Sequence, residues 1–105
     1  MARKLPSIEA NILPLASDLV GLGKVVRNAR AHGRLRIDDA ASLSGVSSDF
    51  LSRLENGKPV TTDRLLKVLE ALGLQILVVP KDMSRLLSKV VLDASLNESD
   101  KESPE

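Results

Sequence analysis

"DDAASLSGVSSDFLSRLENGKP", Asp38 to Pro59, holds two short helical patterns separated by a tight turn. The first pattern fits Asp38–Ser44, with alanines and a leucine as its apolar members. Gly45 then breaks the helix, because glycine adopts backbone angles that other residues avoid. Ser47 can cap a second helix at its start, and Gly57 can end it. Two helices joined by a glycine-containing turn are typical of a helix-turn-helix motif.

The inner side of this motif has the residues that such a geometry requires. Ala41 provides a small side chain where the two helices cross, and Gly45 follows it by four positions. Val46, Leu51 and Leu54 can fix the second helix to a core. Each of these residues alone would be weak evidence for the motif. Together with the two flanking helices, they make the motif the best interpretation of this stretch.

The outer side of the second helix carries hydrogen-bonding groups, where an ordinary surface helix would carry Glu and Lys. These residues are Ser48, Asp49, Ser52, Arg53 and Asn56. Asp49 has two explanations, contact with a base or stabilisation of the positive end of the helix. Phe50 could contact a thymine methyl group or cover the edge of the core, and we favour the core. The side as a whole suggests a surface that recognises a ligand.

Further helices are expected on both sides of the motif, which predicts a mainly α fold of four to five helices. Residues 1–16 are expected to form a flexible arm. A helix from Asp18, capped by Ser17, would bury one side, namely Leu19, Leu22, Val26 and Ala29. Thr61 or Thr62 would cap the helix that ends at Gly73, and another amphipathic helix would lie within 81–96. An acidic, disordered tail would follow at 97–105.

"LQILVVP", residues 74–80, is predicted to be a single β-strand. It is rich in β-branched residues and ends at Pro80. Its apolar members are Leu74, Ile76, Leu77, Val78 and Val79. A lone strand needs a hydrogen-bonding partner, and the chain offers no second convincing strand. The unpaired strand therefore predicts a homodimer.

The composition narrows the possible functions. The 105 residues favour one domain, which would span 17–80, and the chain has no cysteine, one histidine and one aromatic residue. These counts argue against disulfides, metal sites and stacking on single-stranded nucleic acid. Neither a membrane span nor a signal peptide is expected, so we predict a cytoplasmic protein. We also expect no enzymatic activity and no cofactor.

The net charge is only +1, but positive residues are concentrated from Lys24 to Arg36, with no carboxylate among them. The sequence resembles the phage-repressor/Cro-type (XRE) helix-turn-helix family, which has a lambda-repressor-like fold. The resemblance covers Asp18–Gly73 and rests on the quoted motif followed by "LLKVLEALGL". With strand 74–80 added, the chain resembles more narrowly the HipB-type antitoxin subgroup. That subgroup implies a homodimer joined by these strands, a HipA-type kinase toxin as partner, and repression of its own operon.

The resemblance also implies functional residues, in a protein that would bind double-stranded DNA in the nucleoid. The second helix of the motif would lie in the major groove, with Ser48, Asp49, Ser52 and Arg53 facing the bases. Phosphate contacts would come from Lys24, Arg27, Arg34, Arg36, Ser47, Asn56 and Lys58. Glu55 would pair with Arg30 or Arg27.

Two positions depart from the family pattern. Asp49 occupies a position that is often basic or amide-bearing in the family, and its carboxylate could accept from cytosine but would repel phosphate. The other departure is at the start of the first motif helix. The family usually has a glutamine at the start of the first motif helix, where it contacts phosphate and orients a neighbour. This chain has Ile37 there, preceded by Arg36. Arg36 could take over the phosphate contact, but the bridging role of glutamine is lost. Two alternatives to a toxin-linked repressor remain, a protein-binding module that inhibits a partner and a stand-alone phage-type regulator.

Overall fold

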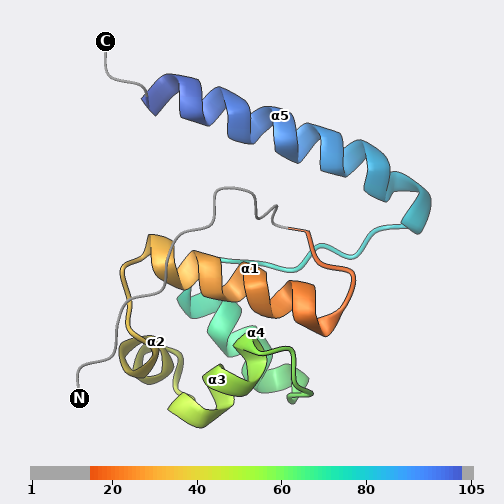
Figure 1. The fold of residues 1–105 in the computed structure, drawn as a ribbon. Coiled ribbons are helices and arrows are strands. Elements are labelled where there is room, and N and C mark those ends of the chain that lie inside the picture. The colour runs from red at the N-terminus through yellow and green to blue at the C-terminus, as the bar shows by residue number, and fades with distance from the viewer. Residues whose placement is uncertain (1–14, 103–105) are drawn as a thin grey trace.

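The computed structural model describes residues 15–102 and is mainly helical (Figure 1). Four helices form one packed body. They are α1 (Leu19–His32), α2 (Ile37–Ser44), α3 (Ser48–Glu55) and α4 (Thr62–Ala71). An extended segment then leads to a short 3-10 turn, η1 (Lys81–Met83), and to the long helix α5 (Ser84–Glu102), which stands apart from the body in Figure 1.

The motif helices lie where the sequence predicted, except that α2 begins at Ile37, one residue before the expected Asp38. Ser47 caps α3, and its hydroxyl oxygen accepts a hydrogen bond from the Phe50 amide at 3.0 Å. Gly45, Gly57 and Gly73 all have a φ near +73°, a left-handed conformation that glycine adopts without strain. Thr61 is the N-cap position of α4, which decides between the two threonines.

Two expectations about α1 are corrected. Its cap is Asp18 and not Ser17, since the Asp18 carboxylate accepts from the Gly21 amide at 2.7 Å. Its inward side is made by Gly23, Val26, Arg30 and Ala31. Leu19, which was expected to be buried, is 42% exposed. Val26 is buried and Leu22 packs against the core as predicted, but the pattern missed that the helix also packs through a glycine and an arginine.

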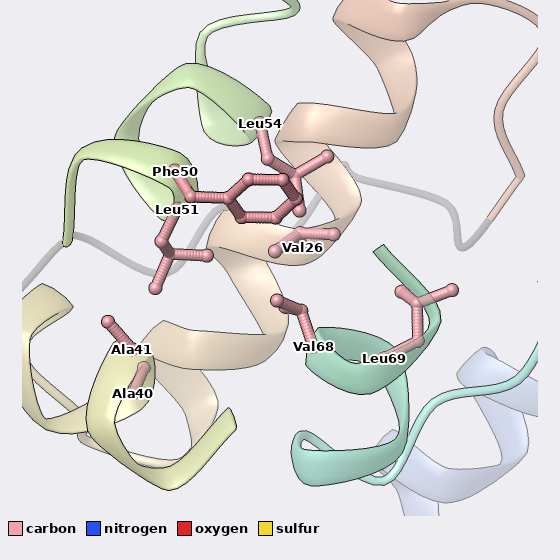
Figure 2. Packing of buried hydrophobic residues seen from close by; sticks show 8 residues of the cluster. All are labelled: Val26, Ala40, Ala41, Phe50, Leu51, Leu54, Val68 and Leu69. Carbon is pink, nitrogen blue, oxygen red and sulfur yellow. The ribbon is translucent and has the colours of Figure 1, made fainter. Parts of the chain in front are cut away.

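The hydrophobic core lies between the four helices. Figure 2 shows eight buried side chains that meet there, namely Val26, Ala40, Ala41, Phe50, Leu51, Leu54, Val68 and Leu69. Ala41, Leu51 and Leu54 are therefore buried as predicted, and Val46 packs against the same cluster while partly exposed. Phe50 belongs to the core, which decides between its two explanations.

Gly23 sets how closely α1 approaches α3. A β-carbon built on Gly23 would lie 2.5 Å from the Leu54 carbonyl oxygen and 2.7 Å from that of Glu55. Only a residue without a side chain allows the two backbones to come this close. The C-terminal end of α3 therefore rests directly on the backbone of α1.

The segment 74–80 is extended but has no hydrogen-bonded neighbour of the β type within the described residues 15–102. Leu77 and Val78 are 71% and 90% exposed, and Ile76 is half exposed. Pairing of this segment with a second copy stays a prediction, because the structure contains a single chain.

The C-terminal helix is longer than expected. It continues to Glu102, so residues 97–102 are helical where the sequence suggested a disordered tail. The stretch 84–102 has neither glycine nor proline to stop a helix, and Pro104 is the first such residue. Most of the predicted arm at 1–16 lies outside the described residues, as does 103–105. No helix in the described part has the length and apolar character needed to cross a membrane.

Candidate nucleic-acid interface

The predicted base-reading residues all lie on the side of α3 that faces away from the core. Phe50, Leu51 and Leu54 point inward and are buried. Asp49 and Arg53 are exposed, and Ser48 and Ser52 are partly exposed. Because helix positions four apart share a face, these four side chains form one continuous polar surface. We call Ser48, Asp49, Ser52 and Arg53 the outer face of α3.

Ser48 has a partner that the sequence did not suggest. Its hydroxyl group donates a hydrogen bond to the Asp38 carboxylate, with 2.8 Å between Ser48 Oγ and Asp38 Oδ1. Asp38 lies in the first turn of α2, which packs against α3. The start of α2 is thus joined to the first residue of α3 across the motif. Asp38 thereby supplies a bridge between the two helices even though Ile37 replaces the family's glutamine.

At the other end of α3, two polar side chains are held by the chain itself. Arg53 Nη2 donates to the Pro59 carbonyl oxygen at 3.3 Å, a long and therefore weak bond. Asn56 Nδ2 donates to the Ser52 carbonyl oxygen at 2.7 Å. One hydrogen of the Asn56 amide is therefore already used within the helix end. Arg53 is exposed and has further N–H groups.

A buried ion pair fixes α3 on α1. The Arg30 guanidinium donates to both Glu55 carboxylate oxygens, at 2.6 Å from Nε and 2.8 Å from Nη2. Arg30 Nη1 also donates to the Leu35 carbonyl oxygen at 3.0 Å, in the turn between α1 and α2. The side chains of Arg30 and Glu55 are only 7% and 6% exposed. The partner of Glu55 is therefore Arg30 and not Arg27. Because Arg30 is buried in this ion pair, it does not contribute to the positively charged surface.

The five cations predicted to contact phosphate are all exposed. They are Lys24, Arg27, Arg34, Arg36 and Lys58. Arg36 is the N-cap residue of α2, two positions before the Asp38 that bonds to Ser48. The Lys58 amide donates to the Arg53 carbonyl oxygen at 2.9 Å, at the opposite end of α3. Arg36 therefore lies close in the chain to the start of the outer face and Lys58 to its end, and the start also carries the carboxylates of Asp38 and Asp49.

On α1, Arg27 lies one helical turn after Gly23, which touches the end of α3. Arg34 follows α1 and adopts a left-handed conformation, with φ of 55°. Ser47 Oγ accepts the cap hydrogen bond from the Phe50 amide, and its hydroxyl hydrogen can still donate to an anion at this helix end. Among the side chains that the structure describes, residues 15–94, no cluster of His, Cys, Asp and Glu is suited to a metal ion.

Comparison with known proteins shows which family this chain belongs to. Residues 22–78 match a family model described as a helix-turn-helix domain. The chain belongs to this family.

A relative lies in Sinorhizobium fredii (strain NBRC 101917 / NGR234), where the protein is named uncharacterized HTH-type transcriptional regulator y4mF. The two sequences are 39% identical over 56 residues, which is 52% of this chain and 74% of the relative.

Proposed function

We propose that this protein is a DNA-binding transcriptional regulator that reads the major groove with α3. The helix-turn-helix family and a relative named as a transcriptional regulator support this proposal. The observation that carries it is the division of α3 into a buried side and a polar outer face, with Arg36 and Lys58 close in the chain to its start and end. Phosphate contacts from such cations position a protein on DNA, and contacts with base edges provide the specificity.

The proposed active form is a homodimer that acts as a repressor. Segment 74–80 supports this form, because Ile76, Leu77 and Val78 are exposed and the backbone of the segment has no β partner in the described part of the chain. Pairing of two such segments about a two-fold axis would satisfy both. A dimer would present two copies of α3 to two half-sites of an operator.

In its most specific form, the proposal is a HipB-type antitoxin that binds a HipA-type kinase toxin and represses the operon of the pair. The support is the position of the exposed segment directly after α4, as the resemblance implies. The exposed apolar side chains of α5, among them Leu86 and Val90, favour a further protein contact. They are also compatible with a protein-binding module that reads no DNA, and a stand-alone phage-type regulator is the remaining alternative.

Titration of labelled DNA from directly upstream of the gene tests DNA reading. Arg53→Ala should weaken binding by about 1–3 kcal/mol per half-site and relax the preference at one base position. The matched control is Lys58→Ala, which should weaken binding to all sequences alike, since phosphates carry no sequence information. Equal loss for every single-base variant of the site would show that Arg53 contacts the backbone. Failure of the wild-type protein to bind any duplex would remove the proposal.

Sedimentation tests the dimer. Leu77→Pro removes a backbone donor in segment 74–80 and should give a monomer. Leu43→Ala is the control, since Leu43 is an exposed apolar residue on α2, outside the segment. A wild-type protein that sediments as a monomer at micromolar concentration would contradict the proposed assembly.

A further inference from the structure

The hydrogen bond between Ser48 and Asp38 determines what Ser48 can offer to a ligand. Ser48 is the first residue of α3 and lies on its outer face. Its Oγ is 2.8 Å from Asp38 Oδ1, a distance typical of a hydroxyl bonded to a carboxylate. The two residues come from different helices, so the bond depends on the crossing of α2 and α3.

The direction of this bond follows from the chemistry of the groups. An ionised carboxylate has no hydrogen and can only accept, so the one hydrogen of the Ser48 hydroxyl must lie on the line to Asp38. What remains on Ser48 Oγ is its capacity to accept. A serine without such a partner can either donate or accept, and it therefore discriminates poorly between bases. Asp38 removes the donating alternative.

The edges of bases in the major groove differ in this respect. Adenine and cytosine present an amino group, at N6 and N4, whereas guanine and thymine present carbonyl oxygens, at O6 and O4. An oxygen that can only accept will bond to the amino groups and will meet the carbonyl oxygens without a hydrogen between them. The acceptor is thus selective where a free hydroxyl would not be.

We propose that Asp38 is a specificity-determining residue that makes Ser48 a hydrogen-bond acceptor for the amino group of adenine or cytosine. This inference rests on the proposed function, because it requires α3 to lie in the major groove. Asp38 acts through Ser48 and is a positioning residue that need not touch DNA. Bonds between a hydroxyl and a carboxylate are stronger than neutral ones, so the hydroxyl keeps this orientation when a base approaches.

Selection of binding sites from a random duplex library provides the test. For wild-type protein, one position in each half-site should favour adenine or cytosine over guanine or thymine by about three- to tenfold, the effect of one hydrogen bond. Asp38→Asn should reduce this preference to less than about twofold. The asparagine amide can donate to Ser48 as well as accept from it, so Ser48 regains both alternatives.

Asp39→Asn is the matched control, because Asp39 is the next residue of α2, is exposed and carries the same charge. Both variants remove one negative charge near DNA and should raise overall affinity to a similar degree. Only Asp38→Asn should change the base preference. Circular dichroism at the binding temperature establishes that each variant is folded. Ser48→Ala provides a second route, since it should abolish the preference at the same position.

The outcomes separate the two proposals. If the wild-type protein selects no sequence, the proposed function fails and this inference fails with it. If the wild-type protein selects a site but Asp38→Asn leaves every base preference intact, the inference alone is overturned. A preserved preference in Ser48→Ala, or a wild-type preference for guanine or thymine at the position that Ser48→Ala alters, has the same consequence.

Discussion

Replacing Glu55 with alanine should destabilise the domain by about 3–5 kcal/mol, the cost of leaving a buried charge without its partner. The change removes two charge-assisted hydrogen bonds, of 2.6 and 2.8 Å, and leaves the Arg30 guanidinium at a site where the side chain is 7% exposed. A domain of this size rarely has more than about 3–5 kcal/mol of total stability. The variant should therefore be largely unfolded at room temperature.

Urea denaturation followed by circular dichroism measures the effect, at one protein concentration for all variants because a dimer's stability depends on concentration. Arg27→Met is the control, an exposed arginine one turn earlier on the same helix, and should change stability by less than about 0.5 kcal/mol. The double variant Arg30→Met/Glu55→Leu should recover most of the loss, since replacing both charges with apolar groups is often close to neutral.

Two results would refute this account of the ion pair. One is a loss of less than about 1 kcal/mol for Glu55→Ala, which would mean that water reaches the Arg30 guanidinium easily. The other is a double variant no more stable than Glu55→Ala, which would mean that the Arg30 bond to the Leu35 carbonyl oxygen, at 3.0 Å, contributes more than the pair itself.

Three further predictions concern other parts of the molecule. Gly23→Ala should destabilise the fold by about 1–3 kcal/mol, because its β-carbon would overlap backbone carbonyl groups. Gly21→Ala is the control and should cost less than about 1 kcal/mol. A urea midpoint that rises for Gly23→Ala would contradict the close approach of α1 and α3. The Thr61 hydroxyl and the Arg64 amide donate hydrogen bonds that lower the pKa of the exposed Asp63 carboxyl. The contribution of Asp63 to stability is therefore present above the unfolded-state pKa and is lost as pH falls through the folded-state pKa. Thr61→Val should raise the pKa of Asp63 in an NMR titration. If the five exposed cations contact phosphates, affinity for DNA should fall about 10³- to 10⁵-fold between 50 and 200 mM salt for ~6–10 contacts, and a nearly flat salt response would leave these cations as ordinary surface residues.

The motif could be predicted from the sequence because its signals are local. Ser47 as a cap, Gly45 and Gly57 as left-handed residues, and Leu51 and Leu54 as core residues each follow from short-range rules. The resemblance to a known family added the pairing of Glu55 with an arginine of α1. These features needed no knowledge of how the helices cross.

Most of the features that were missed depend on how the helices cross. Asp38 and Ser48 are ten positions apart and meet only because α2 lies across α3. Gly23 reads as a weak point in a helix, and its close contact with the end of α3 appears only in three dimensions. The burial of Arg30 likewise could not be predicted from a pattern of apolar residues. The end of α5 was missed for a simpler reason, since polar composition was given more weight than the lack of a helix breaker.

The division of α3 into two sides has a consequence for protein engineering. The residues that hold the helix in place and those of its outer face are different residues, so the surface could be rewritten while the scaffold is retained. Substitutions at Asp49 and Arg53 should be tolerated, because exposed positions usually change stability by less than about 0.5 kcal/mol. Ser48 is the exception, because it is hydrogen-bonded to Asp38, and a designer would have to change the two residues together.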